Sequence, residues 1–100
     1  MNLPKTVEII DVGPRDGFQN IPEWIPTEVK LEVIDKLVAS GLTKIELTSF
    51  VHPKAIPQMA DAADILSASK KKHPALDCIA LVPNLFGAKK AIEAGADSIT

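Results

Sequence analysis

Apolar residues in this chain follow two different periods that alternate along the sequence. Short β-branched runs predict strands at residues 7–12, 43–47, 76–82 and 96–100. Apolar positions at helical spacing predict helices between Thr27 and Gly41, over residues 58–72 and over residues 85–94. Thr27 and Asn84 are expected to cap the first and third helices, and Gly41 and Gly95 to end them.

Strands and helices that alternate without hairpin turns predict an α/β fold with a parallel sheet. A doubly wound open sheet and a (β/α)8 barrel both agree with this order. A complete barrel needs roughly 250 residues, and no helix follows the fourth predicted strand. We therefore expect residues 1–100 to form the N-terminal part of a larger domain, with a small self-contained α/β fold as the less favoured alternative.

The composition allows a packed core and restricts the partners. The sequence has 100 residues, of which 46% are hydrophobic, and a net charge of −2, so no basic surface for nucleic acid or an anionic membrane is expected. Cys78, the single cysteine, lies in an apolar predicted strand, which favours a buried unreactive thiol and a reducing compartment. The first residues have neither secretory nor transit-peptide character, so we expect a cytoplasmic location.

Polar residues gather where the predicted strands end. They are Asp11, Arg15, Asp16, Glu46, Thr48, Ser49 and Asn84. In both candidate architectures these strand ends form the face that binds ligands. A carboxylate such as that of Asp16 suits a hard divalent cation, and the guanidinium of Arg15 suits a neighbouring oxyanion. The alternative is a surface turn in which Arg15 and Asp16 only pair with each other.

Glu46 is the most informative of these polar residues. It alternates with Ile45 and Leu47, so its side chain is expected on the opposite face of the strand from theirs. A buried carboxylate without a partner is costly, and Arg15 is the obvious partner. A purely structural Arg15–Glu46 pair is the alternative, although such a pair is compatible with catalysis because a carboxylate can orient an arginine.

The remaining candidates are weaker. Gly13-Pro14 neither continues a strand nor starts a helix comfortably, so Arg15 and Asp16 are expected to lie on a sharp turn flanked by glycines. For Phe18 and Trp24, a role in packing is favoured over a role in lining a pocket.

Neither histidine is assigned to a metal, because the two lack a short ligand spacing. His52 lies in the predicted loop over residues 48–57, where a solvated side chain is favoured over a ligand contact. His73 follows the lysine run of residues 70–72, expected at the end of a helix, and is expected at the surface.

Four segments, in order along the chain, together resemble a known family. They are VGPRDGFQN at residues 12–20, IELTSFVHPK at 45–54, PQMAD at 57–61 and LVPN at 81–84. The RDGxQ core alone is shared with isopropylmalate and homocitrate synthases. With Gly13-Pro14 and the TSFV segment, the chain resembles the 3-hydroxy-3-methylglutaryl-CoA lyases, within a group of metal-dependent TIM-barrel lyases and synthases.

The resemblance implies an architecture and a reaction. Residues 1–100 would be the N-terminal three and a half βα units of one TIM-barrel catalytic domain. The reaction would cleave 3-hydroxy-3-methylglutaryl-CoA to acetyl-CoA and acetoacetate with Mg²⁺ or Mn²⁺, a step of ketone-body formation and leucine degradation. The full-length enzyme would act on an acyl-CoA substrate as a homo-oligomer, expected to be a dimer.

The resemblance also implies roles for individual residues. Asp16 would be a metal ligand, and Arg15 would stabilise the enolate that develops at the thioester oxygen. Glu46 matches an active-site glutamate, and Gln19 and Ser49 would help to shape the acyl pocket.

The family's remaining metal ligands, a His-x-His pair and an Asn, and its catalytic cysteine do not occur within these 100 residues. Ile21-Pro22 also departs from the family, which commonly has a Glu after the Asn. We therefore expect residues 1–100 alone to be inactive. The alternatives are a lyase for another 3-hydroxyacyl-CoA, a Claisen-type synthase of the same group, and a non-catalytic half-barrel that self-associates.

Overall fold

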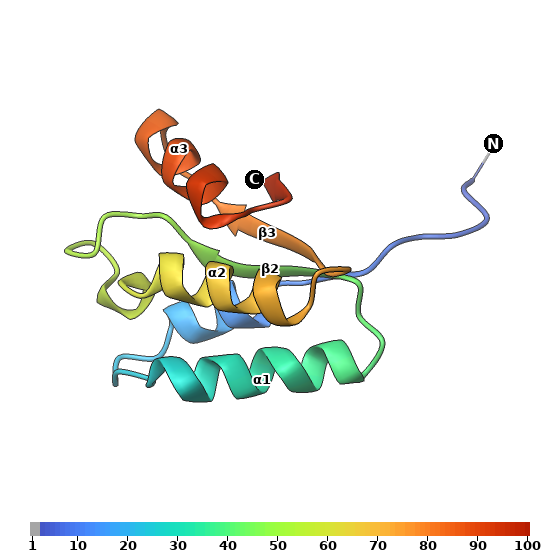
Figure 1. Ribbon diagram of the computed structural model, residues 1–100, viewed down its shortest axis with the longest axis horizontal. Helices are drawn as coiled ribbons and strands as arrows, with labels where there is room; N and C mark the ends of the chain where they lie inside the picture. Colours follow the sequence, from blue (N-terminus) through green and yellow to red (C-terminus); the bar gives the residue numbers. More distant parts are fainter. Residues whose placement is uncertain (1–2) are drawn as a thin grey trace.

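Four parallel strands and three α-helices alternate along the chain in the computed structural model, which describes residues 3–100 (Figure 1). Two short helical turns, η1 and η2, lie in the loops. The elements are β1 (Ile10–Asp11), η1 (Gly13–Gly17), α1 (Thr27–Ala39), β2 (Lys44–Ser49), η2 (Pro57–Met59), α2 (Ala62–Lys72), β3 (Asp77–Leu81), α3 (Leu85–Ala94) and β4 (Ser98–Ile99).

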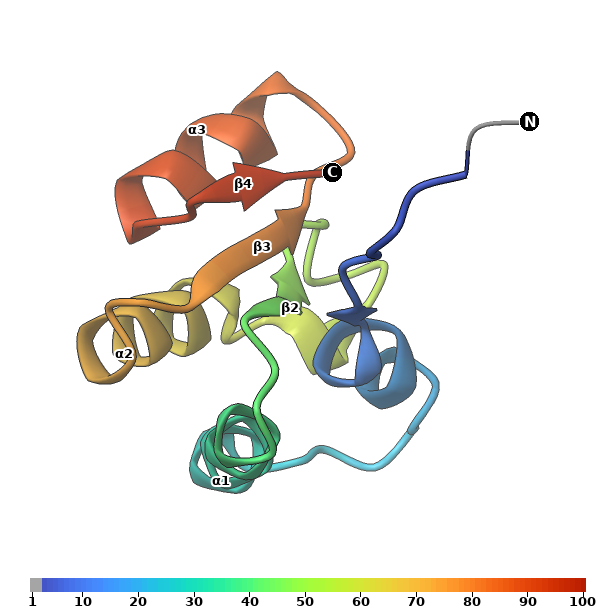
Figure 2. The ribbon, with the colours of Figure 1, turned by 90° about the vertical axis from the view of Figure 1, so that its right-hand side faces the viewer.

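The strands lie in the sheet in the order β1-β2-β3-β4, and every pair is parallel. The sheet is curved, and α1, α2 and α3 all lie on its convex side (Figure 2). A doubly wound sheet would place helices on both faces and reverse its strand order at a switch point. Sequential order with helices on one side is instead the arrangement of a (β/α)8 barrel, so the expected three and a half βα units are confirmed.

The core fills the space between the sheet and the helices. Its fully buried members are Ile34, Ile45, Leu47, Ile65, Leu66, Leu76 and Cys78. They come from α1, α2, β2, β3 and the segment before β3, so each strand–helix unit contributes to one shared core. We call the end of the sheet where the strands finish the carboxyl edge, and the end where they begin the amino edge.

The outer strands are shorter than their sequence pattern predicts. Only Ile10 and Asp11 of the predicted strand over residues 7–12 pair with β2, and the side chains of Val7 and Ile9 are 81% and 70% exposed. The fourth strand likewise consists of Ser98 and Ile99 rather than residues 96–100. β1 and β4 are the outermost strands, so each pairs with only one neighbouring strand. An apolar sequence alone does not supply the hydrogen-bond partners that a second neighbouring strand would provide.

The segment after β1 corrects the expectation of a sharp turn. Residues Gly13–Gly17 form one π-helical turn, in which the backbone N–H groups of Arg15 and Asp16 both donate to Val12 O. Pro14 is buried in the first positions of this turn, where the missing N–H costs no helical hydrogen bond.

The helix boundaries also differ in detail. Thr27 is the first residue of α1, not its cap, and its hydroxyl donates instead to Asp61. On this helix the charged Lys30 is buried, whereas the apolar Val29 is 43% exposed. The predicted helix over residues 58–72 is divided into η2 and α2.

The remaining helix signals are confirmed. Asn84 caps α3 by accepting a hydrogen bond from Gly87 N at 2.8 Å. Gly41 and Gly95 adopt φ values of +102° and +101° after α1 and α3, a region that favours glycine.

Candidate active site

Arg15 and Glu46 form an ion pair at the carboxyl edge, as their positions predict. Nε of Arg15 donates a hydrogen bond to Oε1 of Glu46, and the two side chains are only 19% and 7% exposed. Arg15 comes from η1 and Glu46 from the middle of β2, so the pair joins the first two strand–helix units. The guanidinium is held in a fixed direction because its partner lies on a rigid strand.

Thr100 completes the environment of the Glu46 carboxylate. Its hydroxyl donates to Oε2 of Glu46 at 3.2 Å, so the two carboxylate oxygens have different partners. The Thr100 backbone is fixed next to β3, because its N–H donates to Ala80 O. Sequence analysis missed this residue, although it is a polar residue that follows a strand, like the residues that were selected.

Asp16 differs from Glu46 in its exposure. Its side chain is 56% exposed, and its only ion-pair contact within residues 3–100 joins Oδ1 to Nη1 of Arg15 at 3.4 Å. The carboxylate is therefore open to solvent beside a cation that is already paired with Glu46. This arrangement leaves Asp16 oxygens available to an additional ligand.

A bulge in β2 decides which residues share the face of Glu46. Glu46 pairs with Ile79 and Thr48 pairs with Ala80, so Leu47 is an extra residue in the ladder. Leu47 packs in the core, and the Thr48 hydroxyl contacts Sδ of Met59 at 3.6 Å. Both therefore lie on the helix side.

Ser49, paired with Leu81, consequently shares the inner face with Glu46. β2 extends through Thr48 and Ser49, so the loop begins later than residue 48. The expectation that Thr48 joins the site is therefore wrong, whereas Ser49 is placed on the correct face.

Two of the polar residues at the strand ends have local structural roles. Asp11, the last residue of β1, accepts a hydrogen bond from Gly13 N at 2.8 Å through its side chain. A Cβ atom at position 13 would lie 2.9 Å from the same Asp11 oxygen, so a larger residue there would displace the Asp11 carboxylate. Asn84 is occupied as the cap of α3.

Gln19 lies at a cavity of about 250 Å³ between the loop before α1 and the loop before α2. Its neighbour Asn20 donates through its side chain to Asp16 O at 2.9 Å, which connects this loop to η1. Gln19 is thus close in sequence to Arg15 and Asp16 but lines a separate opening.

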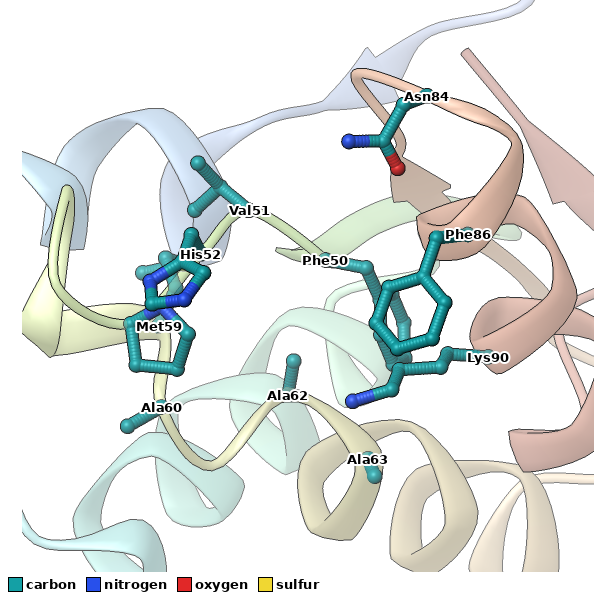
Figure 3. Close-up of a pocket in the computed structure, with 11 residues that line it drawn as sticks. Phe50, Val51, His52, Met59, Ala60, Ala62, Ala63, Asn84, Phe86 and Lys90 are labelled. Atoms are coloured by element: carbon teal, nitrogen blue, oxygen red, sulfur yellow. The ribbon is translucent and has the colours of Figure 1, made fainter.

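A second cavity, of about 260 Å³, lies between the loop after β2 and α3 (Figure 3). Phe50, Met59 and Ala62 line it, and Lys90 lies with Nζ 4.7 Å from the centre of the Phe86 ring. His52 also lines this cavity, but its Nδ1 accepts a hydrogen bond from Lys54 N, so the ring has a local role.

His73 and Cys78 lie away from the carboxyl edge. His73 is not a free surface residue, because Nε2 lies 2.7 Å from Oδ1 of Asp35. Cys78 is fully buried, and burial raises the pKa of its thiol to about 11. The expectation of an unreactive thiol agrees with this environment.

The described part of the chain supplies few metal ligands. Within residues 3–100, no three His, Cys, Asp or Glu side chains come together in a way that would hold a metal ion. The carboxylate of Glu46 is already occupied by Arg15 and Thr100, which leaves Asp16 as the available oxygen donor. The same residues contain no helix that is both long and apolar enough to span a membrane.

The fold and this site define a class of protein: an α/β-barrel protein with a charged site at the carboxyl edge of its strands. The HMGL-like family model matches residues 6–100, and the chain belongs to this family.

Individual relatives agree with the family match. The chain is 48% identical to the mitochondrial hydroxymethylglutaryl-CoA lyase of Rattus norvegicus, over 98% of this chain and 30% of that protein. It is 45% identical to a cytoplasmic 3-hydroxy-3-methylglutaryl-CoA lyase of the same species, over 97% and 28%. The chain thus spans less than a third of the length of these two relatives.

Solved structures of lyases superpose closely on the chain. The Bacillus subtilis HMG-CoA lyase gives a TM-score of 0.86 at 46% identity, over 99% of this chain and 33% of that one. An Acinetobacter baumannii HMG-CoA lyase, solved with coenzyme A and 3-methylmalate, gives 0.85 at 39% identity, over 92% and 30%.

Proposed function

We propose that the protein containing this chain is a carbon–carbon lyase that cleaves 3-hydroxy-3-methylglutaryl-CoA to acetyl-CoA and acetoacetate. The observation that carries the proposal is the Arg15–Glu46 pair at the carboxyl edge, next to the solvent-open carboxylate of Asp16. Membership of the family and its lyase relatives support the class of reaction.

Arg15 is the proposed catalytic cation. Cleavage of the carbon–carbon bond sends an electron pair toward the thioester, so negative charge develops on the thioester oxygen. A guanidinium that is already oriented stabilises this charge without reorganising. Nε of Arg15 is bound to Glu46 and Nη1 contacts Asp16, which leaves Nη2 and the second hydrogen of Nη1 available to the substrate.

Glu46 holds Arg15 in place, and Asp16 is the proposed metal ligand. A bound Mg²⁺ or Mn²⁺ would lower the pKa of the tertiary hydroxyl and orient the substrate. Asp16 offers an exposed oxygen of the type these ions prefer, but one carboxylate does not complete a coordination sphere. The other ligands would come from outside these 100 residues.

Gln19 and Ser49 are proposed to shape the acyl pocket, with Gln19 contributing from the opening between the loops before α1 and α2. Ser49 lies on the inner face with Glu46 and contributes a hydroxyl there. Residues outside these 100 would determine whether the protein cleaves this substrate, cleaves another 3-hydroxyacyl-CoA or catalyses a Claisen-type condensation.

We propose that the full-length protein is a cytoplasmic homodimer that acts in ketone-body formation and leucine degradation. The relatives include both mitochondrial and cytoplasmic enzymes.

The direct test is acetoacetate release from 3-hydroxy-3-methylglutaryl-CoA by the full-length protein, with Mg²⁺ and then with EDTA. EDTA-sensitive release supports the lyase. Absence of release with this substrate, combined with turnover of another 3-hydroxyacyl-CoA, would reassign the substrate.

One observation favours a non-enzymatic behaviour for residues 1–100 in isolation. Ile10 in β1, Ile9 directly before it and Ile99 in β4 are exposed at the two outermost strands of the sheet. Unpaired apolar edges promote association. We expect this segment alone to elute as oligomers in size-exclusion chromatography, with and without Mg²⁺, and to release no acetoacetate; a monomer with EDTA-sensitive turnover would contradict both expectations.

A further inference from the structure

The buried side-chain amide of Gln58 holds the loop that follows η1, the turn that carries Arg15 and Asp16. Gln58, in η2, accepts a hydrogen bond from Ile25 N at 3.0 Å and donates to Ile21 O at 2.9 Å and to Glu23 O at 2.8 Å. The amide thus uses its oxygen and both of its hydrogens on one irregular loop. An inverted amide would face carbonyl oxygens with its own oxygen, so only one orientation satisfies all three bonds.

A buried ion pair fixes the backbone that carries this amide. Nζ of Lys30 donates to Gln58 O at 2.6 Å and to Oδ1 of Asp61 at 2.9 Å. The side chains of Lys30 and Asp61 are 3% and 7% exposed, and Nζ also lies 4.1 Å from the centre of the Trp24 ring. The other Asp61 oxygen accepts from Thr27, so α1, η2 and the loop before α1 form one connected network.

The loop of residues 20–26, which Gln58 holds, continues directly from η1, the turn that carries Arg15 and Asp16. Ile21 N donates to Phe18 O at 3.0 Å, and Asn20 donates to Asp16 O at 2.9 Å. Displacement of the loop at Ile21 would therefore move the end of η1. Gln58 itself forms no hydrogen bond with Arg15 or Asp16, so any effect on them passes through this loop.

We propose that Gln58 is a positioning residue, which sets the orientation of Arg15 and Asp16 through the loop of residues 20–26. A catalytic role for this positioning rests on the lyase function proposed above, and it gives the loop before α2 a role at the neighbouring site. A merely structural Gln58 would contribute stability without coupling to η1.

Lys70 offers a matched control at the amino edge. Its Nζ also makes three hydrogen bonds, to Pro74 O, Leu76 O and Oδ2 of Asp97. Lys70→Met therefore removes as many hydrogen bonds as Gln58→Leu, but far from η1. Gln58→Glu keeps the shape and an acceptor for Ile25 N while it replaces the two donors.

The first measurement is amide hydrogen exchange on the full-length protein. In the wild type, the amides of Arg15, Asp16 and Ile25 should open as one unit, with the same dependence on denaturant. In Gln58→Leu and Gln58→Glu, protection at Arg15 and Asp16 should fall at least about tenfold, and in Lys70→Met less than about twofold. Independent opening in the wild type, or unchanged protection at Arg15 and Asp16, would overturn the proposal, and the wild-type measurement decides even if a variant does not fold.

The second measurement compares kinetics well below the melting temperature of each variant. Gln58→Glu should lower kcat/KM at least about tenfold and weaken Mn²⁺ binding, whereas Lys70→Met should change neither by more than about twofold. If Gln58→Glu and Lys70→Met lower the melting temperature equally and neither changes kcat/KM, Gln58 contributes only to stability and the positioning role is wrong. Absence of lyase activity in the wild type would reject the proposed function, while the exchange result would still decide the positioning role.

Discussion

Charged residues occur at both edges of the sheet, but in different surroundings. At the carboxyl edge and the loops above it, the Arg15–Glu46 and Lys30–Asp61 pairs are largely buried. At the amino edge, the pairs of Lys44, Lys70 and Lys72 with acidic partners have side chains that are 28–71% exposed.

Exposed pairs at this edge lower the pKa values of Asp35 and Asp97 but contribute little to the free energy of unfolding. A hydrogen bond from Lys72 and one from His73 lower the pKa of Asp35. At Asp97 partial burial acts in the opposite direction, but hydrogen bonds from Cys78 N and Lys70 keep the pKa of this carboxyl below its usual value. Solvent screens such pairs, which are typically worth about 1 kcal/mol or less.

The buried pairs have the opposite character. Removing one member leaves the other charge without water or a partner, which is strongly destabilising. The carboxyl edge tolerates buried charge because each buried charge has several fixed partners. That arrangement is suited to holding a guanidinium still, whereas the amino edge only connects helices to strands.

The largest expected effect is on the proposed catalytic cation. In the full-length protein, Arg15→Gln should reduce kcat for acetoacetate release by about 10³-fold, because under the proposed function the developing charge on the thioester oxygen loses its fixed cation. Mn²⁺ affinity should remain within a few-fold of the wild type. Near-normal turnover would remove Arg15 from the proposed role.

The next effect is on stability at the same edge. Lys30→Met should lower the free energy of unfolding by about 3 kcal/mol, because Asp61 is left as a buried charge. Denaturant unfolding of the full-length protein measures this change. The double variant Lys30→Met/Asp61→Leu should recover part of the loss, and a single variant with wild-type stability would show that the pair is not buried in solution.

Asp16→Asn tests the proposed metal ligand. Neutralising the exposed carboxylate should weaken Mn²⁺ binding at least about tenfold, because a charged oxygen ligand is lost. Titration of Mn²⁺ into the full-length protein measures the dissociation constant. An unchanged constant excludes Asp16 from direct coordination.

The smallest effect is expected at the amino edge. Asp35→Asn should cost at most about 1 kcal/mol at neutral pH, because its pairs with Lys72 and His73 are exposed to solvent. The pKa of Asp35 is lowered from 3.8 in the folded state, so its stabilisation is present above about pH 4 and lost as the pH falls. Unfolding curves of wild type and variant should therefore converge in acid; a difference that persists there would indicate another cause.

Local sequence patterns were enough to predict the order of the elements and the main ion pair. Helical and strand periodicities depend on local backbone geometry, so they placed three helices and a parallel sheet correctly. The alternation of Glu46 with Ile45 and Leu47 required only the side-chain period of a strand, and the cost of burying an unpaired carboxylate then identified Arg15.

The features that join distant segments follow from tertiary contacts and could not be predicted from local patterns. The bulge at Leu47 depends on the ladder with β3, and it places Ser49 rather than Thr48 on the inner face. Burial of Lys30, the contact of Thr100 with Glu46 and the attachment of Gln58 to its loop join residues that are 28 or more positions apart. Local propensity contains no information on such contacts, because a polar residue reveals that it needs a partner but not which partner the fold provides.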